Sequence, residues 1–290
     1  MKVVMLRNLA PGEFIQGTIF TCALSDSYPN IAALGMLITA RCDTAQDKAE
    51  VYNYIPLVPV ESWIAKDGLE IVAKRAAANE MGSMKKAIAD AGMDDVIIEL
   101  ISFDEILREL KKGTSKPEKS IAARFEKALT SYNLAKHIIN QENRLLKSSL
   151  EYLSSNDGIY KSVIKELINN GIAEFHYIQK SYSGEETRGY VALMREIRFI
   201  SSSLGKKIAI GLDVNEFDAE KDSYAPGLNH VRFSKDQDFA MPLSCISSPL
   251  IELVMQRFAN LFSRIGVEDI PKEWIVEAHS WVKVMQEDTK

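Results

Sequence analysis

The sequence predicts an α+β fold, with a small β-barrel-like unit at the N-terminus, a long connecting helix and a mixed α/β C-terminal domain. Apolar runs typical of core strands stand close together at 17–24, 35–40 and 54–60. A helical spacing of apolar residues then continues over roughly 35 residues, and a second amphipathic pattern lies near the C-terminus. The predicted domains are 1–112, 113–155 and 156–290.

Composition and charge are those of an ordinary globular protein. The 290 residues are 46% hydrophobic and 26% charged, with a net charge of −5 and a pI near 5.6. This balance argues against a surface built entirely for nucleic acid, but it allows a local basic groove. Cys22, Cys42 and Cys245 are widely spaced, as is typical of reduced thiols. Because no signal peptide or membrane-spanning run is recognisable, we expect a cytoplasmic protein.

The three N-terminal strands are bounded by turn residues. Pro11-Gly12 precedes the first run, Gly17–Leu24, and the polar segment Ser25–Asn30 follows it. Gly35–Ala40 and Tyr54–Val60 supply the second and third strands. Trp63 comes directly after the third strand, where its ring can cap a small core.

Two helices and one further strand are expected before residue 113. Good helix formers predict a helix over Leu69–Ala91, ended by Gly92. The apolar run Val96–Ser102 predicts a strand. Asp104 near the start and basic residues at the end predict a short helix over Phe103–Lys112.

The most regular pattern of the chain follows Gly113–Pro117, the predicted domain boundary. Apolar residues recur at spacings of mostly four and three, interrupted only at Glu142: Ile121, Phe125, Ala128, Tyr132, Ala135, Ile139, Leu146, Leu150 and Leu153. This predicts one helix over 118–153, on the order of 50 Å long. Such a seam needs a partner, which is either another helix of this chain or the same helix of a second subunit in a homodimer.

The C-terminal domain combines strands, helices and a long loop. The expected elements are a helix ending near Asn170, a strand over Ile172–Gln179, a helix or strand over Tyr190–Ser202, and a strand over Lys207–Leu212. The polar run 213–238 predicts a long loop.

Two helices close the predicted domain. Ser247-Ser248-Pro249 begins a mostly buried helix whose apolar face includes Leu250, Val254 and Phe258. The spacing of Trp274 and Trp281 places both rings on one face of a final helix.

The polar segment between the second and third strands is the best-placed candidate site. Charged side chains at the end of a buried strand often form sites supported by a rigid element. The candidate binding residues are Arg41, Asp43, Gln46, Asp47 and Lys48. Cys42 could have a lowered pKa beside Arg41, although a small residue at a strand end is the simpler interpretation.

Other chemical signatures are weak. There is no HExxH or CxxC pair, no glycine-rich phosphate loop and no GxSxG elbow, so we expect neither a metal nor a cofactor. The pattern of metal-dependent nucleases is also incomplete. A basic cluster near the predicted boundary offers nucleic-acid candidates at Lys111, Lys112, Lys116 and Lys119, with a solvated hinge as the simpler interpretation.

The N-terminal strand pattern resembles the toxin ribonucleases of the MazF/PemK type. The resemblance rests on the glycine-led strand Gly17–Leu24, on Gly35–Thr39 followed by the polar Ala40–Thr44, and on the strand leading into Pro56–Ser62. It implies an SH3-like barrel and RNA cleavage without metal, through an arginine after the first strand and a hydroxyl after the third. Ser25–Ala33 has no arginine, so Arg41 would act from another loop.

Under that resemblance the catalytic candidates are Arg41, Asp43 and Ser62. Residues 247–266 and the Cys42-Asp43 pair also resemble uncharacterised bacterial proteins encoded among phage-defence genes. The first hypothesis is therefore a non-enzymatic interaction or sensor component of a bacterial anti-phage or toxin–antitoxin-like defence system, homodimeric through helix 118–153. The alternative is a metal-independent RNA endonuclease.

Overall fold

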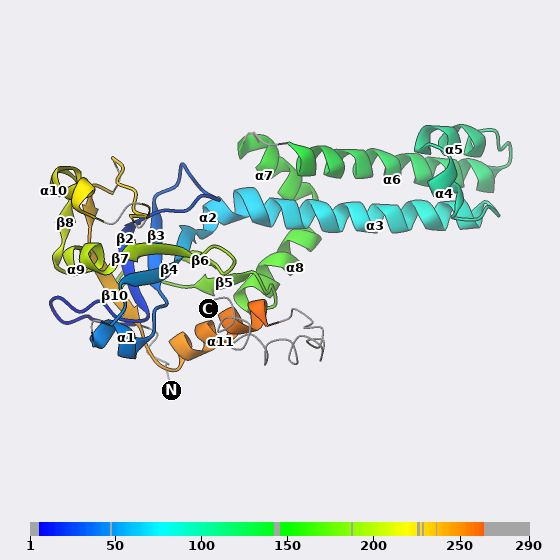
Figure 1. Cartoon of the computed structure of the whole chain (residues 1–290). Helices are drawn as coiled ribbons and strands as arrows, with labels where there is room; N and C mark the ends of the chain where they lie inside the picture. The colour runs from blue at the N-terminus through cyan, green and yellow to red at the C-terminus, as the bar shows by residue number, and fades with distance from the viewer. Residues whose placement is uncertain are drawn as a thin grey trace, which may run out of the picture.

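A curled antiparallel sheet and a projecting helical arm make up the computed structural model (Figure 1). It describes residues 6–46, 48–141, 146–186, 188–224, 227, 229–235 and 237–263. The mixture of helix and strand confirms the coarse fold class, and the sheet curls into a half-barrel. The SH3-like identity of the unit stays a prediction.

The sheet has the strand order β1-β10-β2-β3-β4-β6-β5, and β7 also pairs with β4. The bounds are β1 (Leu6–Arg7), β2 (Thr18–Ala23), β3 (Ala33–Leu37), β4 (Val51–Pro59), β5 (Phe175–Ile178), β6 (Tyr190–Leu193), β7 (Arg198–Ser201) and β10 (Pro242–Ile246). The predicted strands over 17–24, 35–40 and 54–60 are confirmed as β2, β3 and β4. One sheet therefore joins strands from the ranges 1–112 and 156–290, which the sequence predicts as separate domains.

Strands β6 and β7 share one edge of β4. Val51 to Tyr54 pair with β7, and Leu57 to Pro59 pair with β6. The connection between β6 and β7 leaves the sheet at the point where β4 stops pairing with β7 and begins pairing with β6. Its residues, 194–197, are thereby held beside the middle of β4. The segment Tyr190–Ser202, of undecided type in the sequence, forms these two strands.

The helical arm, defined here as residues 69–140, begins where β4 ends. A short helix α2 (Val60–Trp63) and a π-helical turn η1 (Ile64–Gly68) lead from β4 into α3 (Leu69–Asp90). At the far end come α4 (Ile97–Leu100) and α5 (Phe103–Leu110), and α6 (Lys116–Asn140) returns beside α3 (Figure 1). The predicted helices over 69–91 and 103–112 are confirmed as α3 and α5.

The core of the arm lies between α3 and α6. Met84 and Ile88 of α3 pack in one cluster with Phe125 and Leu129 of α6 and with Ile106 of α5. The partner of the predicted seam therefore lies within this chain. The single helix over 118–153 is wrong, because α6 ends at Asn140, Gln141 is extended, and α7 (Leu146–Ser155) is a separate helix. The homodimer stays a prediction.

Two predicted strands are helical. Val96–Ser102 contains α4, at the far end of the arm, where no described strand is available for pairing. Lys207–Leu212 begins as the last turn of α9 (Ser202–Ile210), whose buried Leu204 and Ile208 lie one turn apart. Gly211, with φ +97°, ends that helix and leads into β8 (Leu212–Asp213), which pairs with β9 (Phe239–Ala240).

The remaining described elements are helices and turns of the C-terminal half of the chain. The helices predicted before Asn170 and after Pro249 are confirmed as α8 (Asp157–Ile168) and α11 (Leu250–Phe262). The expectation that the second is mostly buried is wrong, because only Ile251 and Val254 of α11 are buried. Arg257 of α11 donates to the carbonyl oxygens of Ile172 and Phe175 at 2.9 and 3.0 Å. The predicted loop 213–238 contains α10 (Val214–Glu220) and a 3-10 turn at Lys221–Ser223. Trp274 and Trp281 lie outside the described residues.

Candidate functional site

The polar segment predicted as a binding loop is mostly the short helix α1 (Arg41–Ala45). Arg41, Gln46 and Lys48 are exposed and Asp43 is half-buried, whereas Asp47 lies outside the described residues. The exposed Cys42 thiol donates to Asp43 Oδ1 at 3.4 Å. The segment therefore presents its side chains at the molecular surface.

The structure does not bring the catalytic candidates together. Arg41 and Asp43 precede β4, and Ser62 follows it in α2. Nine residues of strand at about 3.3 Å each separate the two ends by roughly 30 Å. Ser62 instead borders a separate groove of about 830 Å³ that Tyr28 and Ile139 also line. The structure therefore does not place these three residues in one described cavity.

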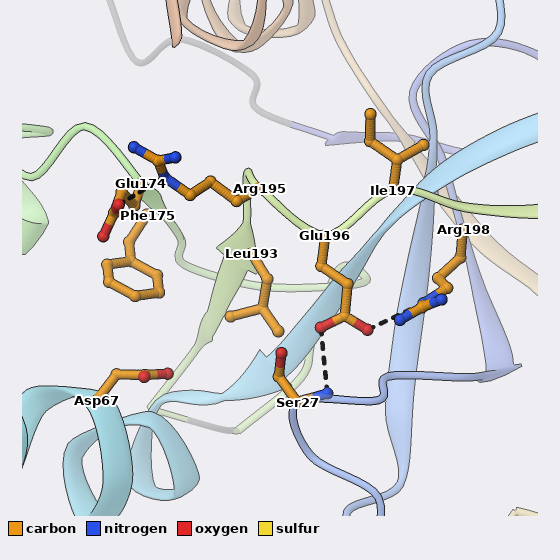
Figure 2. Close-up of a pocket in the computed structure, with 9 residues that line it drawn as sticks. All are labelled: Ser27, Asp67, Glu174, Phe175, Leu193, Arg195, Glu196, Ile197 and Arg198. Atoms are coloured by element: carbon orange, nitrogen blue, oxygen red, sulfur yellow. Dashed lines mark hydrogen bonds and ion pairs between the residues drawn. The ribbon is translucent and has the colours of Figure 1, made fainter. Parts of the chain in front are cut away.

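A polar cavity of about 340 Å³ lies where the arm leaves the sheet, and we call it the root cavity (Figure 2). Its lining residues are Ser27, Asp67, Glu174, Phe175, Leu193, Arg195, Glu196, Ile197 and Arg198. They come from the loop after β2, from the π-helical turn, from the start of β5 and the residue before it, and from the end of β6, the β6–β7 connection and the start of β7. Segments far apart in the chain thus converge on one space.

The π-helical turn places Asp67 at the root cavity. An inserted residue of this kind widens one helical turn and is frequent at functional sites. Gly68 fits the turn because a Cβ there would meet the Trp63 ring at 2.9 Å. The Tyr28 hydroxyl donates to the Asp67 carboxylate, and Lys66 donates to the Ser27 carbonyl oxygen while lying 4.7 Å from the centre of the Tyr28 ring.

Glu196 holds the loop after β2 against the β6–β7 connection. It accepts hydrogen bonds from Ser25 Oγ at 3.0 Å, from the Asp26 amide at 2.7 Å and from the Ser27 amide at 3.4 Å. Arg198 donates to it at 3.1 Å and also pairs with Asp26. Only 9% of the Glu196 side chain is exposed, so these donors replace its lost hydration.

The two half-buried carboxylates Asp67 and Glu196 of the cavity have pKa values shifted in opposite directions. Burial alone would raise the pKa of Glu196, but its hydrogen bonds with Ser27, Asp26, Ser25 and Arg198 lower it overall. Burial raises the pKa of Asp67, and the negative charges of Glu70 and Glu174 act in the same direction. The Tyr28 hydrogen bond and the nearby Lys66 charge oppose that rise without cancelling it. Such divergent pairs are characteristic of functional sites.

A third charged pair lies at the mouth of the root cavity. Arg195 and Glu174 form an ion pair at 2.5 Å, and both side chains are exposed. Figure 2 shows this pair beside Phe175, away from the Glu196–Arg198 pair. The lining arginines are thus both engaged with carboxylates.

The far end of the arm carries a second candidate surface, the arm tip, defined as Val96, Leu100 and Ile101. Their exposed fractions are 51%, 74% and 36%, and none of the residues of α4 is buried. Large apolar side chains gathered on a projecting element are typical of protein interaction surfaces.

The nucleic-acid candidates lie at the same end of the arm. Lys111 pairs with Glu126 at 2.7 Å, and Lys112 pairs with Glu109 at 2.5 Å. Lys116 and Lys119 are exposed on the first turn of α6. Because carboxylates balance half of these lysines, the basic stripe is weaker than its sequence predicts.

The sequence predictions missed the residues that build the root cavity. Ser25-Asp26-Ser27 is visible as a turn, and the segment containing Glu196 is of undecided type. Ser25 and Glu196 stand 171 positions apart, and no local pattern connects them.

In the part of the chain that the structure describes, no group of histidine, cysteine, aspartate and glutamate side chains could hold a metal ion. No described helix has both the length and the apolar character needed to cross a membrane. Comparisons with protein-family models, with curated proteins and with solved structures found no match to this chain.

Proposed function

We propose that the chain is a non-enzymatic interaction component that presents its helical arm to a partner protein. The exposed arm tip carries this proposal. Val96, Leu100 and Ile101 are not needed for the core of the arm, which Met84, Phe125 and their neighbours fill.

The free energy of burial favours such a contact. Covering a fully exposed aliphatic side chain contributes roughly 1.5–3 kcal/mol, so three side chains at one tip supply a useful part of a binding free energy. The arm is held together by the apolar contacts between α3 and α6, which include Met84, Ile88, Phe125 and Leu129. It places the tip away from the sheet (Figure 1). A rigid element that holds apolar side chains in water needs no reordering on binding.

The enzymatic alternative has weaker support. Metal-independent RNA cleavage stays a prediction, but Arg41 and Ser62 lie at opposite ends of β4 and would need other partners. Nucleic-acid binding, the homodimer and the bacterial defence context also stay predictions from the sequence.

Site-specific photo-crosslinking tests the interaction. A benzophenone side chain is placed at position 100 in the arm tip, or at position 134 on α6, where Leu134 is 52% exposed. In cells that express the protein, position 100 should give one discrete adduct with another polypeptide, and position 134 should give none. The mass of the adduct separates a second copy of this chain from a different protein.

The contact itself is tested with Val96→Asp in the position-100 variant. Its free energy of unfolding should change by no more than about 0.5 kcal/mol, because the side chain is on the surface. The adduct should fall at least about tenfold, since a buried charge opposes the contact. Equal adducts at positions 100 and 134, or an adduct unaffected by Val96→Asp, would contradict the proposal.

A further inference from the structure

We propose that the root cavity binds a small organic cation with an ammonium or guanidinium group. This site lies at the opposite end of the arm from the tip, and the inference does not depend on the proposed interaction. Its volume of about 340 Å³ is at the lower end of the usual range for ligand pockets, roughly 300–1,000 Å³.

One carboxylate of the lining, Asp67, has no ion pair with a described residue. Among the described lining residues, Arg195 pairs with Glu174, and Arg198 pairs with Glu196. Asp67 accepts a hydrogen bond from the neutral Tyr28 hydroxyl and forms no ion pair with a described residue. A bound cation would complete the charge balance of this half-buried carboxylate.

Lys66, whose charge acts on Asp67, contacts the loop after β2. The Lys66 ammonium group donates to the Ser27 carbonyl oxygen and lies over the Tyr28 ring, which holds it beside the loop after β2. Its charge lowers the pKa of Asp67 less than burial raises it. The environment of Asp67 therefore still favours an additional positive charge.

Phe175 and Leu193 give the cavity an apolar wall. Trp63 holds the Phe175 ring edge-to-face, with ring centres 5.3 Å apart. Figure 2 shows Phe175, Leu193 and Asp67 around the same space. An aromatic face next to a carboxylate suits an alkylammonium or alkylguanidinium ion, because the ring attracts the charge and the wall covers the alkyl chain.

An anionic ligand fits this site less well. It would have to compete with Glu174 for Arg195 at 2.5 Å, or with Glu196 and Asp26 for Arg198. Binding an anion at Arg195 would break its ion pair with Glu174, and binding one at Arg198 would also break its hydrogen bond to Glu196.

Ligand-observed NMR titration tests the proposal with three matched probes: n-butylammonium, n-butylguanidinium and butyrate. At neutral pH the full chain should bind at least one cation with a dissociation constant on the order of 1 mM, and butyrate more weakly. Asp67→Asn should weaken cation binding at least about tenfold. The control Glu70→Gln removes the same charge one turn away, outside the cavity lining, and should change binding less than about twofold.

Thermal unfolding shows whether Asp67→Asn alters the folding of the protein. If it does, two further variants still test the proposal. Glu174→Gln releases Arg195 at the exposed mouth and should weaken cation binding several-fold. Phe175→Leu keeps an apolar wall and should also weaken it. The proposal fails if neither cation shows binding at a probe concentration of about ten times the expected dissociation constant. It also fails if the Asp67→Asn variant binds the cations as tightly as the parent does. A third contradicting result would be that butyrate binds more tightly than either cation and that Glu174→Gln strengthens butyrate binding.

Discussion

The two ends of β4 look alike in the sequence and differ in the structure. Each end joins an apolar strand to a short helix with charged residues, Arg41 and Asp43 before it and Glu61, Lys66 and Asp67 after it. The first end presents its side chains to solvent. At the second end, the loop after β2 and the β6–β7 connection converge on the start of the arm.

The difference comes from what pairs with β4 beyond its own hairpin. The start of β4 pairs with β7, and α9 follows β7 directly, so this end is covered by a strand and a helix, and none of the residues that line the root cavity belongs to α1. The end of β4 pairs with β6, and the connection from β6 to β7 passes over its middle with Glu196 directed toward Ser25 and Ser27. Convergence of distant segments creates the cavity, and charged residues at a strand end are not sufficient.

Trp63→Ala and Arg41→Ala should show the largest contrast between the two ends. Trp63 is fully buried among the start of α3, α8 and Phe175, so its removal should cost about 3–5 kcal/mol of unfolding free energy. Arg41→Ala should change it by no more than about 0.5 kcal/mol. Urea unfolding measures both, and similar losses in the two variants would show that α1 is as integral to the fold as the root of the arm.

Glu196→Gln and Asp43→Asn should show a smaller contrast. The amide group at position 196 cannot accept from the Ser25, Asp26 and Ser27 donors as the carboxylate does, and Arg198 loses one of its two partners. We expect a loss of about 2 kcal/mol, against less than about 0.5 kcal/mol for Asp43→Asn.

The pH dependence of the Glu196→Gln effect provides an independent check. The pKa of Glu196 is lowered in the folded protein, so its carboxylate contributes stability above the unfolded pKa of about 4.3. That contribution is lost as the pH falls through the folded pKa. The difference between parent and variant should therefore be constant near neutral pH and shrink in acid. If the difference in stability between parent and variant stays constant down to a pH below the folded pKa, the loss caused by Glu196→Gln comes from packing and not from the carboxylate charge.

The parts of the fold that depend on neighbouring residues could be predicted from the sequence. Two helix starts are fixed by capping boxes, in which Ser102 pairs with Glu105 and Ser115 with Glu118. The long apolar seam predicts a partner helix, and α3 provides it. The break after Asn140 lies beside the one interruption of the apolar spacing, at Glu142, but this signal is weaker than a capping box because the spacing resumes at Leu146.

Predictions that depend on distant partners could not be made in the same way. The run Val96–Ser102 has the composition of a strand, but it lies at the far end of the arm, away from every described strand. Asp94 instead accepts from the Val96 amide and begins a helical turn there. Likewise, nothing near Glu196 in the sequence shows that the loop after β2 supplies its donors. The candidate site therefore became visible only once β6 and β7 were paired with β4.

Asp67→Asn should have the smallest effect on stability and a sign opposite to that of Glu196→Gln. The pKa of Asp67 is raised in the folded protein, so ionisation of its carboxylate is less favourable there than in the unfolded chain, where the pKa is about 3.9. The parent should therefore lose part of its stability as the pH rises from the unfolded pKa through the folded pKa. The neutral amide can still accept from the Tyr28 hydroxyl and has no charge to desolvate. Urea unfolding between about pH 4 and pH 7 should find the variant at least as stable as the parent at pH 7, with their difference changing across this range and Glu70→Gln as the control. A variant that is clearly less stable at pH 7 would mean that the Asp67 charge is already compensated, and that the two carboxylates of the root cavity are both structural anchors.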